Sequence, residues 1–172
     1  MTITLRPVEE ADLPYLHRLT SDPDSTGDFQ WYGWLNPHRL RRGWEDDGLL
    51  GDDKSYLIIV AGDDDVGFLA WTKVPTSRVS YCWSIGLIVA PEHRGKGHGT
   101  QAQKLIVRYL FDHSTVNRIE ASTEVTNVAE QRALEKAGFT REGVLRGIGF
   151  RAGQWRDGVL YSVIRSDLER GL

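Results

Sequence analysis

The stretch APEHRGKGHGTQ, residues 90–101, has glycine at three alternating positions with basic and imidazole side chains between them. Glycines at this density cost chain entropy and add no side chain to a core, but they let the backbone approach a ligand closely. The loop follows an expected strand and precedes an expected helix, where free N–H groups and the helix dipole favour an anion. We therefore predict a phosphate-bearing ligand, held by Arg94, Gly95, Lys96, Gly97, His98, Gly99 and Thr100.

Two common phosphate motifs do not fit this loop. The dinucleotide fingerprint G-x-G-x-x-G differs from the G-x-G-x-G spacing found here. The P-loop pattern G-x-x-x-x-G-K-[ST] fails because Lys96 is followed by Gly97 and position 90 is alanine. A tight strand-to-helix turn without any ligand is the other interpretation, although a single glycine would be enough for such a turn.

The surrounding sequence predicts a mixed α/β fold in one domain, residues 1–172. An antiparallel meander precedes a strand–loop–helix–strand–helix unit, and a hairpin ends the chain. Asn127 is the expected N-cap of the second helix of that unit, and Gly138 its stop. We expect strands at 3–6, 55–61, 66–74, 80–90 and 117–125, and hairpin strands at 144–150 and from 155. We expect helices at 8–19, 37–50, 100–114 and 127–139. The helix at 100–114 should have one apolar face, formed by Ala102, Leu105, Ile106, Tyr109 and Leu110.

Composition excludes several classes of protein. The net charge of −3 and pI of about 5.9 argue against nucleic acid as the main partner. Cys82 is the only cysteine, so no disulfide framework or multi-cysteine metal site is expected, and we predict no metal. No apolar run approaches the roughly 20 residues that span a bilayer, so no membrane partner is predicted. The N-terminal residues lack a signal pattern, and the expected location is cytoplasmic.

Two motifs resemble those of the GNAT N-acetyltransferases. VAPEHRGKGHGT is similar to the family's motif R/Q-x-x-G-x-G/A, which falls on Arg94, Gly97 and Gly99, and NVAEQRALEKAGF is similar to the motif that follows it. FRAGQWRDGVLYSVIR resembles the branch of the ribosomal-protein alanine acetyltransferases. The resemblance covers nearly the whole chain. It implies a central, mostly antiparallel sheet that is splayed between its fourth and fifth strands and flanked by helices.

The resemblance also implies acetyl-CoA as the second substrate. Its pyrophosphate would lie on the backbone amides of residues 94–100, and its pantetheine arm would pair like an extra strand with Leu87 and Val89. The amide of Val89 would hold the thioester oxygen, where N–H donors stabilise developing charge. Asn127 would reach the pantetheine arm.

The positions where the family carries its catalytic acid and base are altered in this chain. Leu134 stands where many members have a tyrosine, Glu130 where the ribosomal-protein branch has a serine, and Ser84 where that branch has a glutamate base. Glu130 is a catalytic candidate, yet an acid in the first turn of a helix is typically an exposed group that complements the dipole. The catalytic roles are therefore open.

Further catalytic candidates lie on two strands. Glu120 and Glu124 face the same side of the strand at 117–125, and either is a candidate to accept a proton from the acceptor amine through water. Solvent exposure is the alternative interpretation for both. Tyr161 on the last strand is a candidate proton donor or a core residue.

The aromatic stretch FQWYGW is the candidate acceptor site. Aromatic rings combine apolar area with attraction for a cation over the ring face. The alternative is a satellite cluster that closes the core. Our candidate substrate-binding residues are Phe29, Trp31, Tyr32, Trp34 and Trp83.

These observations predict an N-acetyltransferase that acts on a small amine metabolite or antibiotic. The resemblance to the ribosomal-protein branch keeps open a protein or peptide amino terminus as the acceptor. A non-catalytic acetyl-CoA sensor is the second alternative, because the acid and base positions are altered. Family members often pair through their last strands, so a homodimer is expected.

Overall fold

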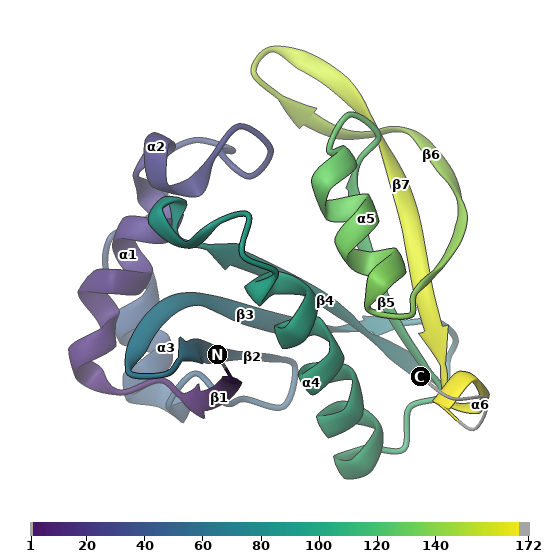
Figure 1. Ribbon diagram of the computed structural model, residues 1–172, viewed down its shortest axis with the longest axis horizontal. Helices are drawn as coiled ribbons and strands as arrows, with labels where there is room; N and C mark the ends of the chain where they lie inside the picture. The colour runs from purple at the N-terminus through teal and green to yellow at the C-terminus, as the bar shows by residue number, and fades with distance from the viewer. Residues whose placement is uncertain (1, 169–172) are drawn as a thin grey trace.

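The computed structural model describes residues 2–168, so the two ends of the predicted 1–172 domain, residue 1 and residues 169–172, lie outside it. Its described residues form one sheet in the order β1-β2-β3-β4-β5-β7-β6 (Figure 1). Neighbouring strands are antiparallel except β4 and β5, which are parallel. This confirms the predicted mixed α/β class. The strands are β1 (Ile3–Pro7), β2 (Lys54–Ala61), β3 (Asp64–Pro75), β4 (Tyr81–Val89), β5 (Arg118–Glu124), β6 (Thr140–Arg151) and β7 (Gln154–Ile164).

Helices cover both faces of the sheet and bury two apolar clusters. Along β2, Leu57 and Ile59 belong to the cluster under α4 and α5, whereas Ile58 belongs to the cluster under α1 and α3. This is the period-two alternation of a strand that is buried on both faces. The helices are α1 (Leu13–Ser21), α2 (Pro23–Thr26), α3 (Arg39–Asp47), α4 (His98–His113), α5 (Val128–Lys136) and α6 (Arg165–Leu168).

The sheet is split between β4 and β5. These strands pair only at Trp83 with Ile119 and at Ser84 with Glu120. Both strands continue beyond those pairs, β4 as far as Val89, and Figure 1 shows them diverging. The splay that the resemblance implied is therefore present.

Helix α4 buries Ala102, Ile106 and Leu110 of the face that its periodicity predicted, but not the other two residues. Leu105 and Tyr109 are 41% and 44% exposed, so the predicted face was partly wrong. Apolar residues lie on adjacent faces of this helix, and periodicity alone could not select the one that meets the sheet. The buried residues are His98, Ala102, Gln103, Ile106, Val107, Leu110 and Phe111.

Local signals at helix and strand ends are confirmed. The Asn127 side chain accepts a hydrogen bond from the amide of Glu130 and caps α5, and Gly138 adopts a φ of +95° just after that helix. The β6–β7 hairpin turns through Ala152 and Gly153, both with positive φ, as a two-residue hairpin turn requires.

We expect Gly67→Ala to destabilise the fold, because a Cβ at this position would lie 2.2 Å from the carbonyl oxygen of Ile88. The backbone of β4 would have to move, and overpacking of this kind costs about 1–3 kcal/mol of unfolding free energy. Gly86→Ala on β4 is the matched control, since nothing lies within 4 Å of its Cβ position. Chemical denaturation measures both, and equal stability of the two variants would contradict the prediction.

Candidate active site

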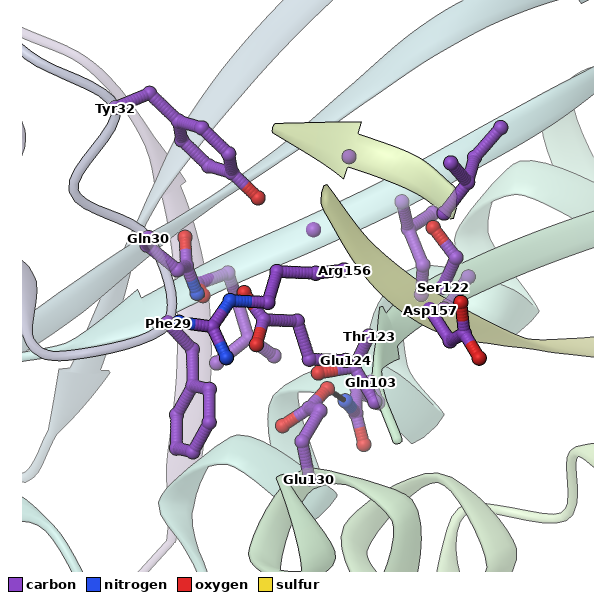
Figure 2. A pocket seen from close by; sticks show the side chains of 17 residues that line it. Phe29, Gln30, Tyr32, Gln103, Ser122, Thr123, Glu124, Glu130, Arg156 and Asp157 are labelled. Atoms are coloured by element: carbon purple, nitrogen blue, oxygen red, sulfur yellow. Dashed lines mark hydrogen bonds between the residues drawn. The ribbon is translucent and has the colours of Figure 1, made fainter. Parts of the chain in front are cut away.

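Two cavities meet at the opening between β4 and β5. The larger, of about 610 Å³, lies between residues 26–30, the glycine-rich loop and α5. The smaller, of about 210 Å³, lies between residues 29–32, β5 and the β6–β7 hairpin (Figure 2). Phe29, Gln30, Leu87 and Glu130 line both cavities. These four residues therefore form the boundary between the two cavities.

The glycine-rich loop forms one wall of the larger cavity. Gly95 and Gly97 have φ values of +76° and +80°, a left-handed conformation that other residues rarely adopt. Gly97 is the N-cap of α4, so the amides of His98, Gly99 and Thr100 have no acceptor within the helix. These three residues line the cavity. The loop and helix start thus present the N–H donors that an anion requires.

The two cations of the loop differ in position, since Arg94 lines the larger cavity and Lys96 does not. Arg94 donates from Nε to the Val89 carbonyl (3.0 Å) and from Nη2 to the Ser25 carbonyl (2.6 Å). Lys96 donates to the Glu92 carbonyl at 3.1 Å and is not among the lining residues. Arg94 therefore joins α2 to the end of β4 at the cavity wall, whereas Lys96 bonds within its own loop.

Positive charge reaches the larger cavity from α5 instead. Arg132 and Lys136 line it, one helical turn apart. Neither residue was expected at the site from the sequence. An i, i+4 spacing of two cations on the helix after Asn127 was the available signal.

His98 contributes a buried polar atom to the same cavity. Its side chain is buried, and Nδ1 has no hydrogen-bond partner. Burial and the nearby charges of Lys96 and His93 lower the pKa of His98. The ring is thus held neutral, and an unpartnered buried nitrogen fits a polar ligand.

The open edge of β4 faces the junction of the two cavities. The carbonyl of Leu87 accepts from Gln30 Nε2 (2.9 Å), and that of Val89 accepts from Arg94. The N–H and C=O of one strand residue point to the same side, so both amides also face the opening. Asn127 lines the larger cavity and donates to Thr123 Oγ1 at 2.9 Å.

Glu130 lies at the junction rather than on an exposed helix surface. Its Oε1 accepts a hydrogen bond of 2.6 Å from Gln103 Nε2, drawn in Figure 2. Burial raises the pKa of Glu130 to about 7, and the bond from Gln103 opposes that rise. A carboxyl group that titrates near neutral pH can accept a proton under physiological conditions.

The two glutamates of β5 occupy different environments. Glu120 lies outside both cavities, and Arg118 Nε is 3.3 Å from its carboxylate. Glu124 lines the smaller cavity, but Arg151 Nη2 binds it at 2.9 Å. The structure therefore does not bring Glu120 to the other candidates, and the charge of Glu124 is already paired.

Two aromatic candidates are core residues. Tyr161 is fully buried, and its hydroxyl donates to Glu135 at 3.0 Å. Trp83 is 7% exposed, and its Nε1 donates to Ser114 Oγ at 3.2 Å. Neither lines the two cavities, so the structure does not bring them to Glu130.

The aromatic stretch divides between two places. Phe29 and Tyr32 line the smaller cavity. Trp31 and Trp34 stack edge to face at 5.1 Å, with Trp34 83% exposed. Trp31 lines a separate surface cavity with residues of the β6–β7 turn. Only half of the stretch is therefore in place to contact an acceptor at the junction.

Gln103, Gln30 and Arg156 also line the site and were missed by sequence reasoning. Gln103 lies on a helix face that is otherwise apolar, and recognition of the correct face would have identified it. Gln30 was hidden within the aromatic stretch. Arg156 lies next to the hairpin turn and carries no local signal.

Residues 2–168 contain neither a membrane-spanning helix nor a cluster of metal ligands. No helix in this range is both long and apolar enough to cross a membrane. No group of three or more His, Cys, Asp or Glu side chains there is arranged to hold a metal ion. The cytoplasmic location and the homodimer stay predictions.

Comparison with known families identifies the fold and its chemistry. Residues 2–140 match the profile of the acetyltransferase (GNAT) domain. The chain belongs to this GNAT family. It is thus an acetyl-CoA-dependent N-acetyltransferase, as its motifs predicted, and the sensor alternative is not supported.

Several relatives resemble this GNAT protein over most of its length. It is 37% identical over 124 residues to the "Probable N-acetyltransferase YjcK" of Bacillus subtilis (strain 168), and this match covers 71% of this chain and 68% of that protein. It is 27% identical over 160 residues to spermidine N(1)-acetyltransferase of Escherichia coli (strain K12), covering 92% and 83%. The crystal structure of spermidine N-acetyltransferase from Vibrio cholerae, in complex with CoA and spermine, superposes with a TM-score of 0.80 at 20% identity and 96% coverage of each chain. The ribosomal-protein branch stays a prediction.

We expect the Glu130 carboxyl to titrate near pH 7, because burial raises its pKa to about 7. Carbon-13 NMR of labelled glutamate side chains, assigned with Glu130→Gln, measures the midpoint. Gln103→Leu should move it upward, since the lost hydrogen bond lowers the pKa of Glu130. A midpoint at about 4.3, the ordinary value of glutamate, would show that Glu130 is solvated.

Proposed function

We propose that this GNAT protein acetylates the primary amine of a small acceptor held in the smaller cavity, with Glu130 as the general base. One observation carries the proposal: Glu130 lines both cavities, and Gln103 holds its carboxylate at 2.6 Å. The base thus stands between the space for the acetyl donor and the space for the amine.

The larger cavity has the groups that acetyl-CoA requires. When bound, acetyl-CoA supplies an activated acetyl thioester. The first-turn amides of α4 would hold its phosphates, and Arg132 and Lys136 would add positive charge. The backbone of Leu87 and Val89 would pair with its extended arm, for which Gln30 and Arg94 would release the two carbonyls.

Proton removal is the chemical task of Glu130. An alkyl amine has a pKa of about 10.4, so it is mostly protonated at pH 7 and cannot attack. A carboxylate with a pKa of about 7 is a suitable acceptor for that proton. The Val89 amide, which faces the opening, would stabilise negative charge that develops on the acyl oxygen.

The size of the smaller cavity favours a small acceptor over a peptide. Its volume of about 210 Å³ is below the roughly 300 Å³ at which pockets for drug-sized ligands begin. The walls formed by Phe29 and Tyr32 suit the apolar part of such a molecule. The relatives named as spermidine N-acetyltransferases also act on a small amine.

Glu130→Gln should lower kcat/KM for the acceptor by about 10²–10⁴ and leave the affinity for acetyl-CoA unchanged, since the amide cannot accept the proton. In the wild type, the rate should rise as the pH increases through about 7, where Glu130 loses its proton. The variant should lack this step in a thiol-release assay. Glu120→Gln, outside both cavities, is the control. Wild-type activity in Glu130→Gln would refute the assignment.

Gly97→Trp should abolish acetyl-CoA binding, because the indole would fill the part of the larger cavity that lies at the first-turn amides of α4. A tryptophan would also rarely adopt the φ of +80° found at this position. Gly153→Trp in the β6–β7 turn has a similar φ of +76° and lies outside both cavities, which makes it the control for backbone strain. Isothermal calorimetry measures both. Equal loss of acetyl-CoA affinity in the two variants would show that backbone strain, and not obstruction of the first-turn amides of α4, causes the loss.

A further inference from the structure

The smaller cavity contains a cation, Arg156, that forms no ion pair with any carboxylate among residues 2–168. Arg156 on β7 extends its guanidinium across the cavity toward Phe29 and Gln30 (Figure 2). Its Nε is buried and has no hydrogen-bond acceptor. Among residues 2–168, no carboxylate lies within 4.0 Å of it as an ion pair.

The nearby acids form no hydrogen bond or ion pair with this cation, although the charge of Arg156 adds to that of Arg151 in lowering the pKa of Glu124. Glu124 is bound by Arg151 at 2.9 Å, with side-chain exposures of 10% and 13%. Asp157 also lines this cavity, but its Oδ1 accepts a hydrogen bond from the Gly147 amide at 2.7 Å. Both carboxylates are thus engaged elsewhere.

An acceptor that fills the cavity must satisfy Arg156. When the acceptor binds, it displaces water from the guanidinium. Loss of water from a cation that has no counter-ion raises the free energy of the complex. A diamine or polyamine would bring only more donors and more positive charge. A carboxylate brings two acceptor oxygens at the spacing of the guanidinium fork.

We propose that the acceptor carries a carboxylate beside its primary amine, and that Arg156 binds this carboxylate. The proposal rests on the acetyltransferase reaction proposed above and names its substrate class as amino acids and related amino carboxylates. The amine end lies toward Glu130 and the carboxylate end toward Arg156, and both residues line the same cavity of about 210 Å³. Phe29 and Tyr32 contact the part between them.

The test uses pairs of acceptors that differ only by the carboxylate: phenylalanine with phenethylamine and lysine with cadaverine, with spermidine added. Thiol release from acetyl-CoA gives kcat/KM for each. In wild type, the carboxylate member of a pair should exceed its partner by about tenfold to a hundredfold, as expected for one charge-assisted interaction. Spermidine should be acetylated more slowly than the better carboxylate acceptor.

Arg156→Gln should remove this preference. We expect it to lower kcat/KM about tenfold or more for the carboxylate member and to change the decarboxylated member less than threefold. Arg146→Gln on β6, outside both cavities, is the matched control and should retain the preference. Calorimetry with acetyl-CoA should give the same dissociation constant for all three proteins, which shows that the fold is intact.

The possible results separate the two proposals. Faster acetylation of spermidine or the decarboxylated amines, unaffected by Arg156→Gln, would overturn the carboxylate proposal and leave the acetyltransferase reaction standing. An equal loss for both members of a pair would also overturn it, because Arg156 would then have a structural role. No turnover with any amine, in a protein that still binds acetyl-CoA, would overturn both proposals.

Discussion

The departure of β4 from β5 after Ser84 is the constraint on which the rest of this structure depends. Backbone groups on the open edge of β4 lose a strand partner and must be satisfied in another way. Gln30 and Arg94 bond the carbonyls of Leu87 and Val89, and so bring the loop after α2 and the glycine-rich loop to the same edge. The two cavities are the space that remains on either side of this junction.

Burial at that junction gives Glu130 its chemical character. Asn127 fixes the start of α5, and the first turn of the helix then places Glu130 in the gap, where loss of water raises its pKa to about 7. Gln103 from α4 holds the carboxylate, so two helices determine the position of one oxygen atom. Arg156 enters the smaller cavity from the opposite wall. The smaller cavity therefore has a carboxyl group and a guanidinium in its walls.

Much of the cofactor side could be predicted from the sequence, because its signals are local. The glycine-rich loop, the Asn127 cap and the Gly138 stop each depend on the conformation of a few consecutive residues. The family resemblance placed the split in the sheet at the correct strands. The acceptor side could not be predicted in the same way, since half of the aromatic stretch turned away, and Trp83 packs in the core.

The sequence by itself determined the fold class, because strand alternation and helix caps follow from neighbouring residues, and two motifs were enough to identify the family. Only the tertiary structure decided which carboxylates line the cavities, and that Arg156 lines the smaller one without an ion pair among residues 2–168. Gln103 and Glu130 are 27 residues apart, as are Glu124 and Arg151. Contacts over such separations depend on how α4 and the β6–β7 hairpin pack against the sheet. Because apolar residues lie on adjacent faces of α4, the periodicity of its sequence could not determine which face packs there.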